Sequence, residues 1–176
     1  TRYGTVTGVQ TCALPICRES RSLLAVHEPA VTLTDYFLAI ESGLFALLLL
    51  RRRPAPAGSV GSAFGLFFFA AALAALAGGT VHGFFPEPLT PGHRTLWTVT
   101  LVSIGLSALA ATIAAARLGM TPGRAYKLTP PFVLLFLAYV AVVVFAVQDF
   151  AIAIAAYLPA TLFLLFRSEE HTSELQ

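Results

Sequence analysis

Four ionisable side chains interrupt the apolar stretches of this sequence, and their types and spacing are suited to chemistry. They are two aspartates, a glutamate and a histidine: Asp35, Asp149, Glu41 and His82. An ionisable group inside a membrane costs roughly 3 kcal/mol on insertion scales, so its presence usually indicates a partner within a helix bundle or a function. A histidine that meets carboxylates at one depth can bind a metal or transfer a proton. Asp35 and Asp149 are therefore candidate catalytic residues, and His82 is a candidate metal ligand.

Each of these candidates also has a purely structural interpretation. Asp35 follows Thr32 and Thr34, and Asp149 precedes an apolar segment, so either carboxylate is suited to cap the positive end of a helix. His82 is alternatively a packing residue that hydrogen-bonds to a neighbouring helix. It lies in the segment GGTVHGF, whose glycines let another backbone approach closely, so we expect tight helix packing there.

Two further polar residues are expected to be buried, namely Glu41 and Thr80. Glu41 follows Asp35 by six positions, which is about 120° around a helix, so the two carboxylates do not share a face. A neutral, hydrogen-bonded acid and a functional carboxylate are both compatible with Glu41. His93, in the segment PGHRTLW, is expected to be a solvated loop residue, with a place beside His82 as the alternative.

Long apolar runs must position these residues. Each reaches the roughly 17 to 25 residues that a helix needs to cross a hydrocarbon core of about 30 Å. The runs lack the period-two alternation of barrel strands, so they are predicted to be helices. The fold class predicted from them is an all-α, polytopic transmembrane helix bundle. Its expected spans are residues 32–50, 60–85, 96–116, 131–147 and 150–166.

The charged residues predict how the chain crosses the membrane. Lys and Arg in short loops are retained in the cytoplasm. The loops after the first and third spans are basic, whereas the loop after the second carries only Arg94. The N-terminus is therefore predicted to lie outside a bacterial inner membrane, with residues 18–31 as an extracytoplasmic segment. The net charge of +2 comes without a basic face that interleaves aromatic residues, so the expected partner is membrane lipid and not nucleic acid.

Both ends of the sequence are expected to be translated sequencing adapter. When the last ten residues are back-translated, reverse-complemented and shifted by two bases, the DNA spells the segment GVQTCALPI of residues 8–16. Residues 1–17 and 167–176 are therefore excluded from the argument about fold and function. This exclusion removes Cys12, Cys17 and His171 from the candidate sites, and it makes the remainder an expected fragment of a longer protein.

Four segments together resemble an uncharacterised family of bacterial multi-pass membrane proteins. They are LTDYFLAIES, GGTVHGFF, LWTVTLVSIGLSA and DFAIAIAAYLPA, which span nearly all of residues 18–166. The resemblance implies a protein of about seven helices, of which five are visible here. That architecture is distantly similar to the alkaline ceramidase and adiponectin-receptor superfamily, whose members bind zinc through one histidine in an early helix and two in the last helix.

That resemblance implies a specific role for His82. It is the residue that matches the early zinc ligand, although Gly78 stands where the superfamily has a serine four positions earlier. A zinc-bound water would then be the nucleophile of a lipid amide hydrolase, with Asp35 or Asp149 as orienting groups. The rival class is a non-catalytic transporter subunit or structural protein. In both cases the sequence predicts an integral membrane protein with an outward-facing polar cluster around His82.

Overall fold

The computed structural model describes residues 26–51 and 59–173, and every regular element within them is a helix. Five helices follow one another along the chain. They are α1 (Pro29–Arg51), α2 (Val60–Phe84), α3 (Pro91–Gly119), α4 (Pro122–Phe145) and α5 (Phe150–Ser173). All five are long and apolar enough to cross a membrane. The all-α prediction is therefore confirmed, and the chain has the architecture of a multi-pass membrane protein.

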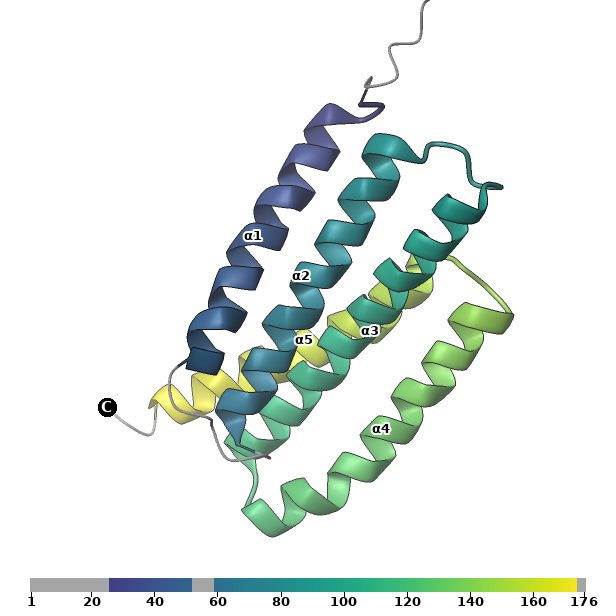
Figure 1. The fold of residues 1–176 in the computed structure, drawn as a ribbon. Helices are drawn as coiled ribbons and strands as arrows, with labels where there is room; N and C mark the ends of the chain where they lie inside the picture. Colours follow the sequence, from purple (N-terminus) through teal and green to yellow (C-terminus); the bar gives the residue numbers. More distant parts are fainter. Residues whose placement is uncertain (1–25, 52–58, 174–176) are drawn as a thin grey trace, which may run out of the picture.

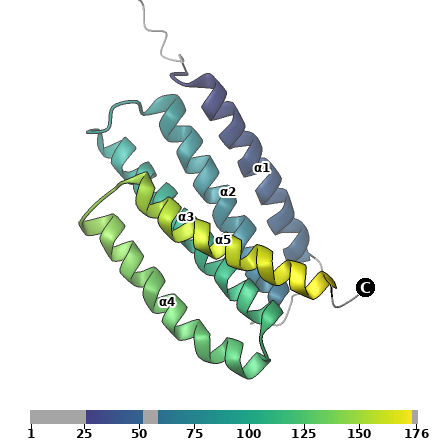
Figure 2. The same ribbon diagram turned by 180° about the vertical axis from the view of Figure 1, so that it is seen from behind.

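The helices are arranged around α3, as Figure 1 shows. Helix α1 packs on α2, α2 packs on α3, and α3 packs on both α4 and α5. The view from behind shows α5 running obliquely across α3 (Figure 2). Within the described residues, α1 does not pack on α5, and α4 does not pack on α5. Two grooves can therefore form, one on each side of α5.

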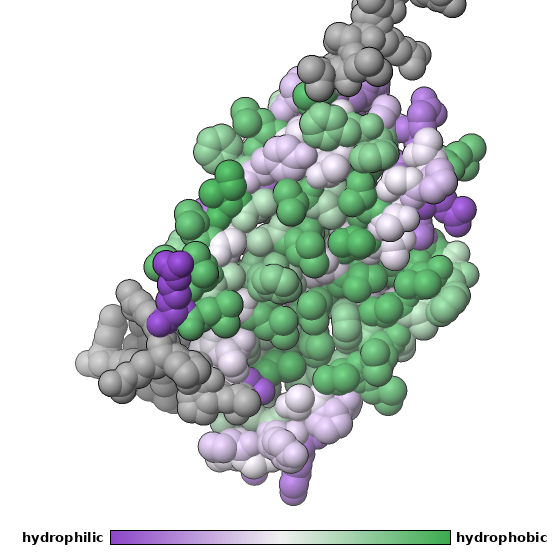
Figure 3. All heavy atoms as spheres, viewed as in Figure 1, coloured by the Kyte–Doolittle hydropathy of each residue, from purple (hydrophilic) through white to green (hydrophobic). Residues whose placement is uncertain are grey.

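Small residues explain why α3 occupies the centre. Its buried positions are mostly alanine, serine, threonine and glycine, which allow neighbouring backbones to approach closely. The outer helices instead carry many exposed leucine, phenylalanine and valine side chains. Apolar residues cover the middle of the surface, and polar residues gather at its two ends (Figure 3). This pattern suits a bundle whose flanks face lipid.

The two ends of the bundle differ in their residues. The end that holds the start of α1, the end of α2 and the start of α3 is called the His82 end here. The opposite end, where α3 finishes and α4 begins, is called the Arg117 end. Of the six Lys and Arg residues in the described parts of the chain, five lie at the Arg117 end, and Arg94 lies at the other.

Helix α4 begins nine residues earlier in the chain than predicted, at Pro122 and not at residue 131. Pro130 and Pro131, expected to open the helix, lie inside it, and the helix starts at Pro122 after the N-cap residue Thr121. Proline suits the first helical position because its missing N–H would be unpaired there anyway. The internal prolines leave the carbonyls of Tyr126 and Lys127 without their usual helical donor. Both of these residues are exposed near the Arg117 end, where water can hydrate the carbonyls.

Candidate functional site

A groove of about 640 Å³ lies toward the His82 end, between α1, α2, α3 and α5. Asp35 and His82 both line it, whereas Asp149 does not. The remaining lining is mostly apolar, with Thr100 and Ser107 of α3 as further polar residues. Because α1 and α5 do not pack together, the groove opens sideways between them.

Glycines in α2 allow α1 to approach this closely. A Cβ atom on Gly79 would lie 2.9 Å from the Cβ of Asp35 and 3.2 Å from the ring of Tyr36. A Cβ atom on Gly83 would lie 3.0 Å from the side chain of Thr32. The 2.9 Å contact is shorter than real Cβ atoms make, and the other two are tighter than most, so Gly79 in particular lets α1 lie this close. The tight helix packing predicted for this segment is confirmed.

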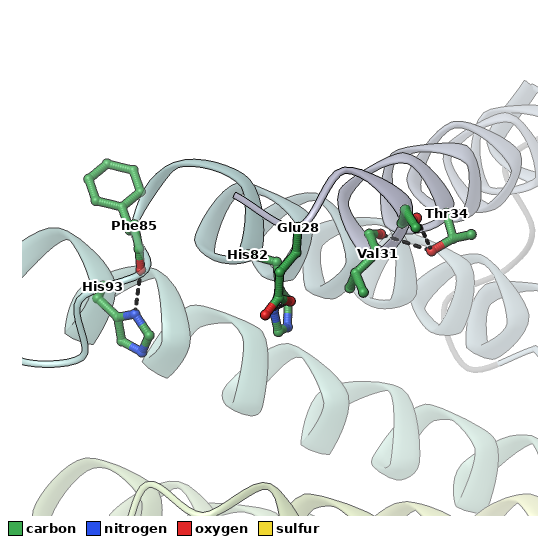
Figure 4. A network of polar contacts seen from close by, with 7 residues as sticks. Glu28, Val31, Thr34, His82, Phe85 and His93 are labelled. Atoms are coloured by element: carbon green, nitrogen blue, oxygen red, sulfur yellow. Dashed lines mark hydrogen bonds and ion pairs between the residues drawn. The ribbon is translucent and has the colours of Figure 1, made fainter. Parts of the chain in front are cut away.

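Glu28 is a site residue that the sequence analysis did not identify. Its carboxylate lies 2.8 Å from Nδ1 of His82, and Figure 4 shows the two side chains together. The backbone N–H of His27 donates to the carbonyl of Gly83 at 3.0 Å, which ties the same segment to α2. Because a carboxylate only accepts, Nδ1 of His82 is the donor, and in a neutral imidazole Nε2 is left as an acceptor. The only sequence signal for this contact is an acidic residue directly before Pro29 at a helix start.

Asp35 is inside α1 and does not cap it. The helix begins six residues earlier at Pro29, so the capping interpretation of Asp35 is wrong. The side chain instead faces α2 and α3, where its Oδ2 would lie 3.6 Å from a Cβ on Gly78, close to Thr100. No hydrogen bond to the Asp35 carboxylate is formed by the described residues, and His82 lies within electrostatic range of it.

Asp149 lies outside the groove. It is exposed just before α5, and its Oδ1 accepts the backbone N–H of Ala151 at 2.9 Å. The capping interpretation is therefore the one realised for Asp149. The neighbouring Gln148 ties the same turn to α3, since its Nε2 donates to Thr98 at 2.7 Å and its carbonyl accepts from Nε1 of Trp97 at 3.2 Å. This turn holds the start of α5 against α3.

Glu41 and Thr80, the two polar residues expected to be buried, differ in their exposure. Glu41 is exposed on the outer face of α1, so that expectation is wrong. The physical reason is that α1 packs only on α2 among the described helices, which leaves most of its circumference uncovered. Thr80 is half-buried, donates to the carbonyl of Leu76 at 2.7 Å, and pairs with the hydroxyl of Tyr36 at 3.1 Å. The hydrogen bond between Thr80 and Tyr36 links α2 to α1 next to Asp35.

His93 does not join His82. It lies in the first turn of α3 and not in a loop, because Thr90 caps the helix and Pro91 occupies its first position. Its Nδ1 is 2.7 Å from the carbonyl of Phe85, as Figure 4 shows. The ring of each histidine has its centroid 6.2 Å from that of Trp97.

The residues described do not fit a zinc site. A histidine whose Nδ1 donates to a carboxylate is the usual arrangement of a zinc ligand, and His82 has it. A site also needs at least three protein ligands, however. Among the side chains that the structure describes, residues 26–51 and 59–169, no three from His, Cys, Asp or Glu lie close enough to hold one metal ion. No reaction step is therefore assigned to zinc.

Comparison with known proteins gives one result. Neither the curated proteins nor the solved structures contain a significant match to this chain. A family model does match, over residues 30–173, which include the helices that line the groove. The chain therefore belongs to the family of unknown function DUF6962.

Proposed function

We propose that this protein is a bacterial inner-membrane protein, with its N-terminus outside, whose groove binds an amphipathic molecule with a cationic head. The observation that carries the proposal is Asp35, a carboxylate in a helix long and apolar enough to cross a membrane, which lines a groove and receives no hydrogen bond from the described residues. Charges placed in apolar surroundings are normally paired. An ionised carboxylate only accepts hydrogen bonds, so its natural partner is a cationic donor such as an ammonium group.

The rest of the groove suits an alkyl chain. Most of its lining is apolar and comes from alanine, leucine and isoleucine side chains of four helices. The sideways opening between α1 and α5 would let a molecule enter from the bilayer without crossing the polar end of the bundle. Glu28 lies directly before α1 and beside His82, and it adds a second negative charge at this end of the groove. Both acids favour a cation at the His82 end.

Trp97 makes this proposal directly testable. It is the only tryptophan of the chain and lines the groove, so a bromine-labelled alkyl chain bound there would quench its fluorescence. The experiment titrates the purified full chain in detergent with a long-chain alkylamine brominated in its tail. The matched ligand is a fatty acid with the same tail, which carries a negative head. We expect the amine to quench Trp97 at about tenfold lower concentration than the acid.

Two variants of α1 separate the proposed site from general charge effects. Asp35→Asn should remove the preference for the amine, because its amide no longer carries the negative charge. Glu41→Gln removes an equal charge from the exposed face of the same helix and should leave the preference intact. Equal quenching by amine and acid in the unaltered protein would overturn the proposal and favour a purely structural role for Asp35 and His82.

A further inference from the structure

The Arg117 end carries a second site, remote from the groove at His82. A pocket of about 540 Å³ lies where α3 ends and α4 begins, and Arg124 and Lys127 of α4 are among its lining residues. None of the described residues that line this pocket is acidic. We propose that it binds the phosphate head of an anionic phospholipid, with an acyl chain of the same lipid between α4 and α5.

The start of α4 is short of negative charge. The first turn of a helix carries a partial positive charge, which acidic residues usually balance. Helix α4 has no acidic residue in its first turn, and Arg124 stands there instead. The N-cap residue Thr121 makes no capping hydrogen bond with its side chain. An external phosphate would therefore balance both the helix terminus and the two basic side chains of α4.

A separate, apolar groove lies further along α4. A cavity of about 290 Å³ lies between α3, α4 and α5, and its lining includes Phe132, Leu135 and Pro159. Leu128 lines the basic pocket, and Phe132 follows it by one helical turn, or about 6 Å. The groove exists because α4 and α5 both pack on α3 but not on each other. Head-binding and chain-binding surfaces therefore follow one another in the order that a phospholipid requires.

The experiment measures lipid adducts on the purified full chain by native mass spectrometry. The probes are phosphatidylglycerol and phosphatidylcholine with identical acyl chains, which differ in net head charge. We expect phosphatidylglycerol to be retained preferentially, and a double variant, Arg124→Gln with Lys127→Gln, to lose about tenfold or more of that binding. Arg94→Gln removes one exposed cation from the opposite end and should bind like the unaltered protein.

A second pair of variants tests the acyl chain. Ala156 lines the apolar groove, so Ala156→Phe should fill it and reduce retention of phosphatidylglycerol. Ala141 is exposed on α4, and Ala141→Phe serves as the control for added bulk. Unchanged binding in the Arg124 and Lys127 double variant, or equal retention of both lipids, would overturn the proposal. Unchanged binding in Ala156→Phe would overturn the placement of the acyl chain. Retained binding of phosphatidylcholine in each variant reports that the bundle remains folded.

Discussion

At the scale of single residues, the position of α1 depends on glycines that no other residue can replace. Gly79→Ala would place a Cβ 2.9 Å from that of Asp35, a backbone-anchored neighbour that cannot rotate away. We expect this change to cost about 1 to 3 kcal/mol, the usual range for overpacking. Thermal unfolding in detergent, followed by circular dichroism, measures the loss.

Gly65 in the same helix provides the matched control. A Cβ at Gly65 meets nothing within 4 Å, so Gly65→Ala adds only helix propensity. Replacing glycine by alanine inside a helix stabilises the helix by up to about 1 kcal/mol. We therefore expect the two alanine variants to shift the unfolding temperature in opposite directions. An unchanged unfolding temperature in Gly79→Ala would show that α1 is not held against α2 at Asp35.

At the scale of helices, hydropathy predicts well which segments form helices and at which end of the bundle a residue lies. It does not predict which helices pack against each other. Five apolar runs predict five helices, and alternating directions bring Asp35 and His82 to one end, as the structure has them. The starts of α3 and α4 were predicted too late, because Thr90, Thr121 and the prolines after them begin helices in polar sequence that hydropathy does not register. Burial also depends on which helices pack together, and apolar periodicity does not encode that in a lipid-facing bundle.

Glu41 and Glu28 show that helix packing could not be predicted from the sequence. Glu41 was expected to be buried because its neighbours in sequence are apolar, yet α1 has only α2 beside it. The Glu28 contact with His82 joins residues 54 positions apart, and neither residue type nor spacing indicates the pairing. Such contacts follow from the register between α1 and α2, which the glycines of α2 determine.

Helix α4 provides a prediction at the same scale, because it packs on α3 alone. The hydroxyl of Tyr139 donates to the carbonyl of Leu101 at 2.7 Å, and its ring covers Gly105. Tyr139→Ala removes this anchor, so amide hydrogen exchange should accelerate throughout α4 while α2 stays protected. Tyr126→Ala, at a position 80% exposed on the same helix, should leave exchange in α4 unchanged. Uniform acceleration in all helices would instead indicate global destabilisation.

At the scale of the whole molecule, the two ends of the bundle have opposite chemical character. Acids and histidines gather at the His82 end, whereas Arg51, Arg117, Arg124 and Lys127 lie at the Arg117 end. Basic loops are retained in the cytoplasm. This asymmetry is the basis of the proposed orientation, and it also places the two proposed ligands in different leaflets. A cationic amphiphile would bind from the outer leaflet, and an anionic phospholipid from the inner one.

Reporter fusions in a bacterial inner membrane test that orientation. Alkaline phosphatase folds only outside the cytoplasm, so a fusion at Pro88, between α2 and α3, should be active. A fusion at Thr121, between α3 and α4, should be inactive, and a fluorescent protein at the two sites should give the reverse pattern. Replacing Arg117, Arg124 and Lys127 together by glutamine should reduce this contrast, because these basic residues flank the connection between α3 and α4 and orient the bundle. Activity at Thr121 and none at Pro88 would invert the topology, and both proposed ligands would then exchange leaflets.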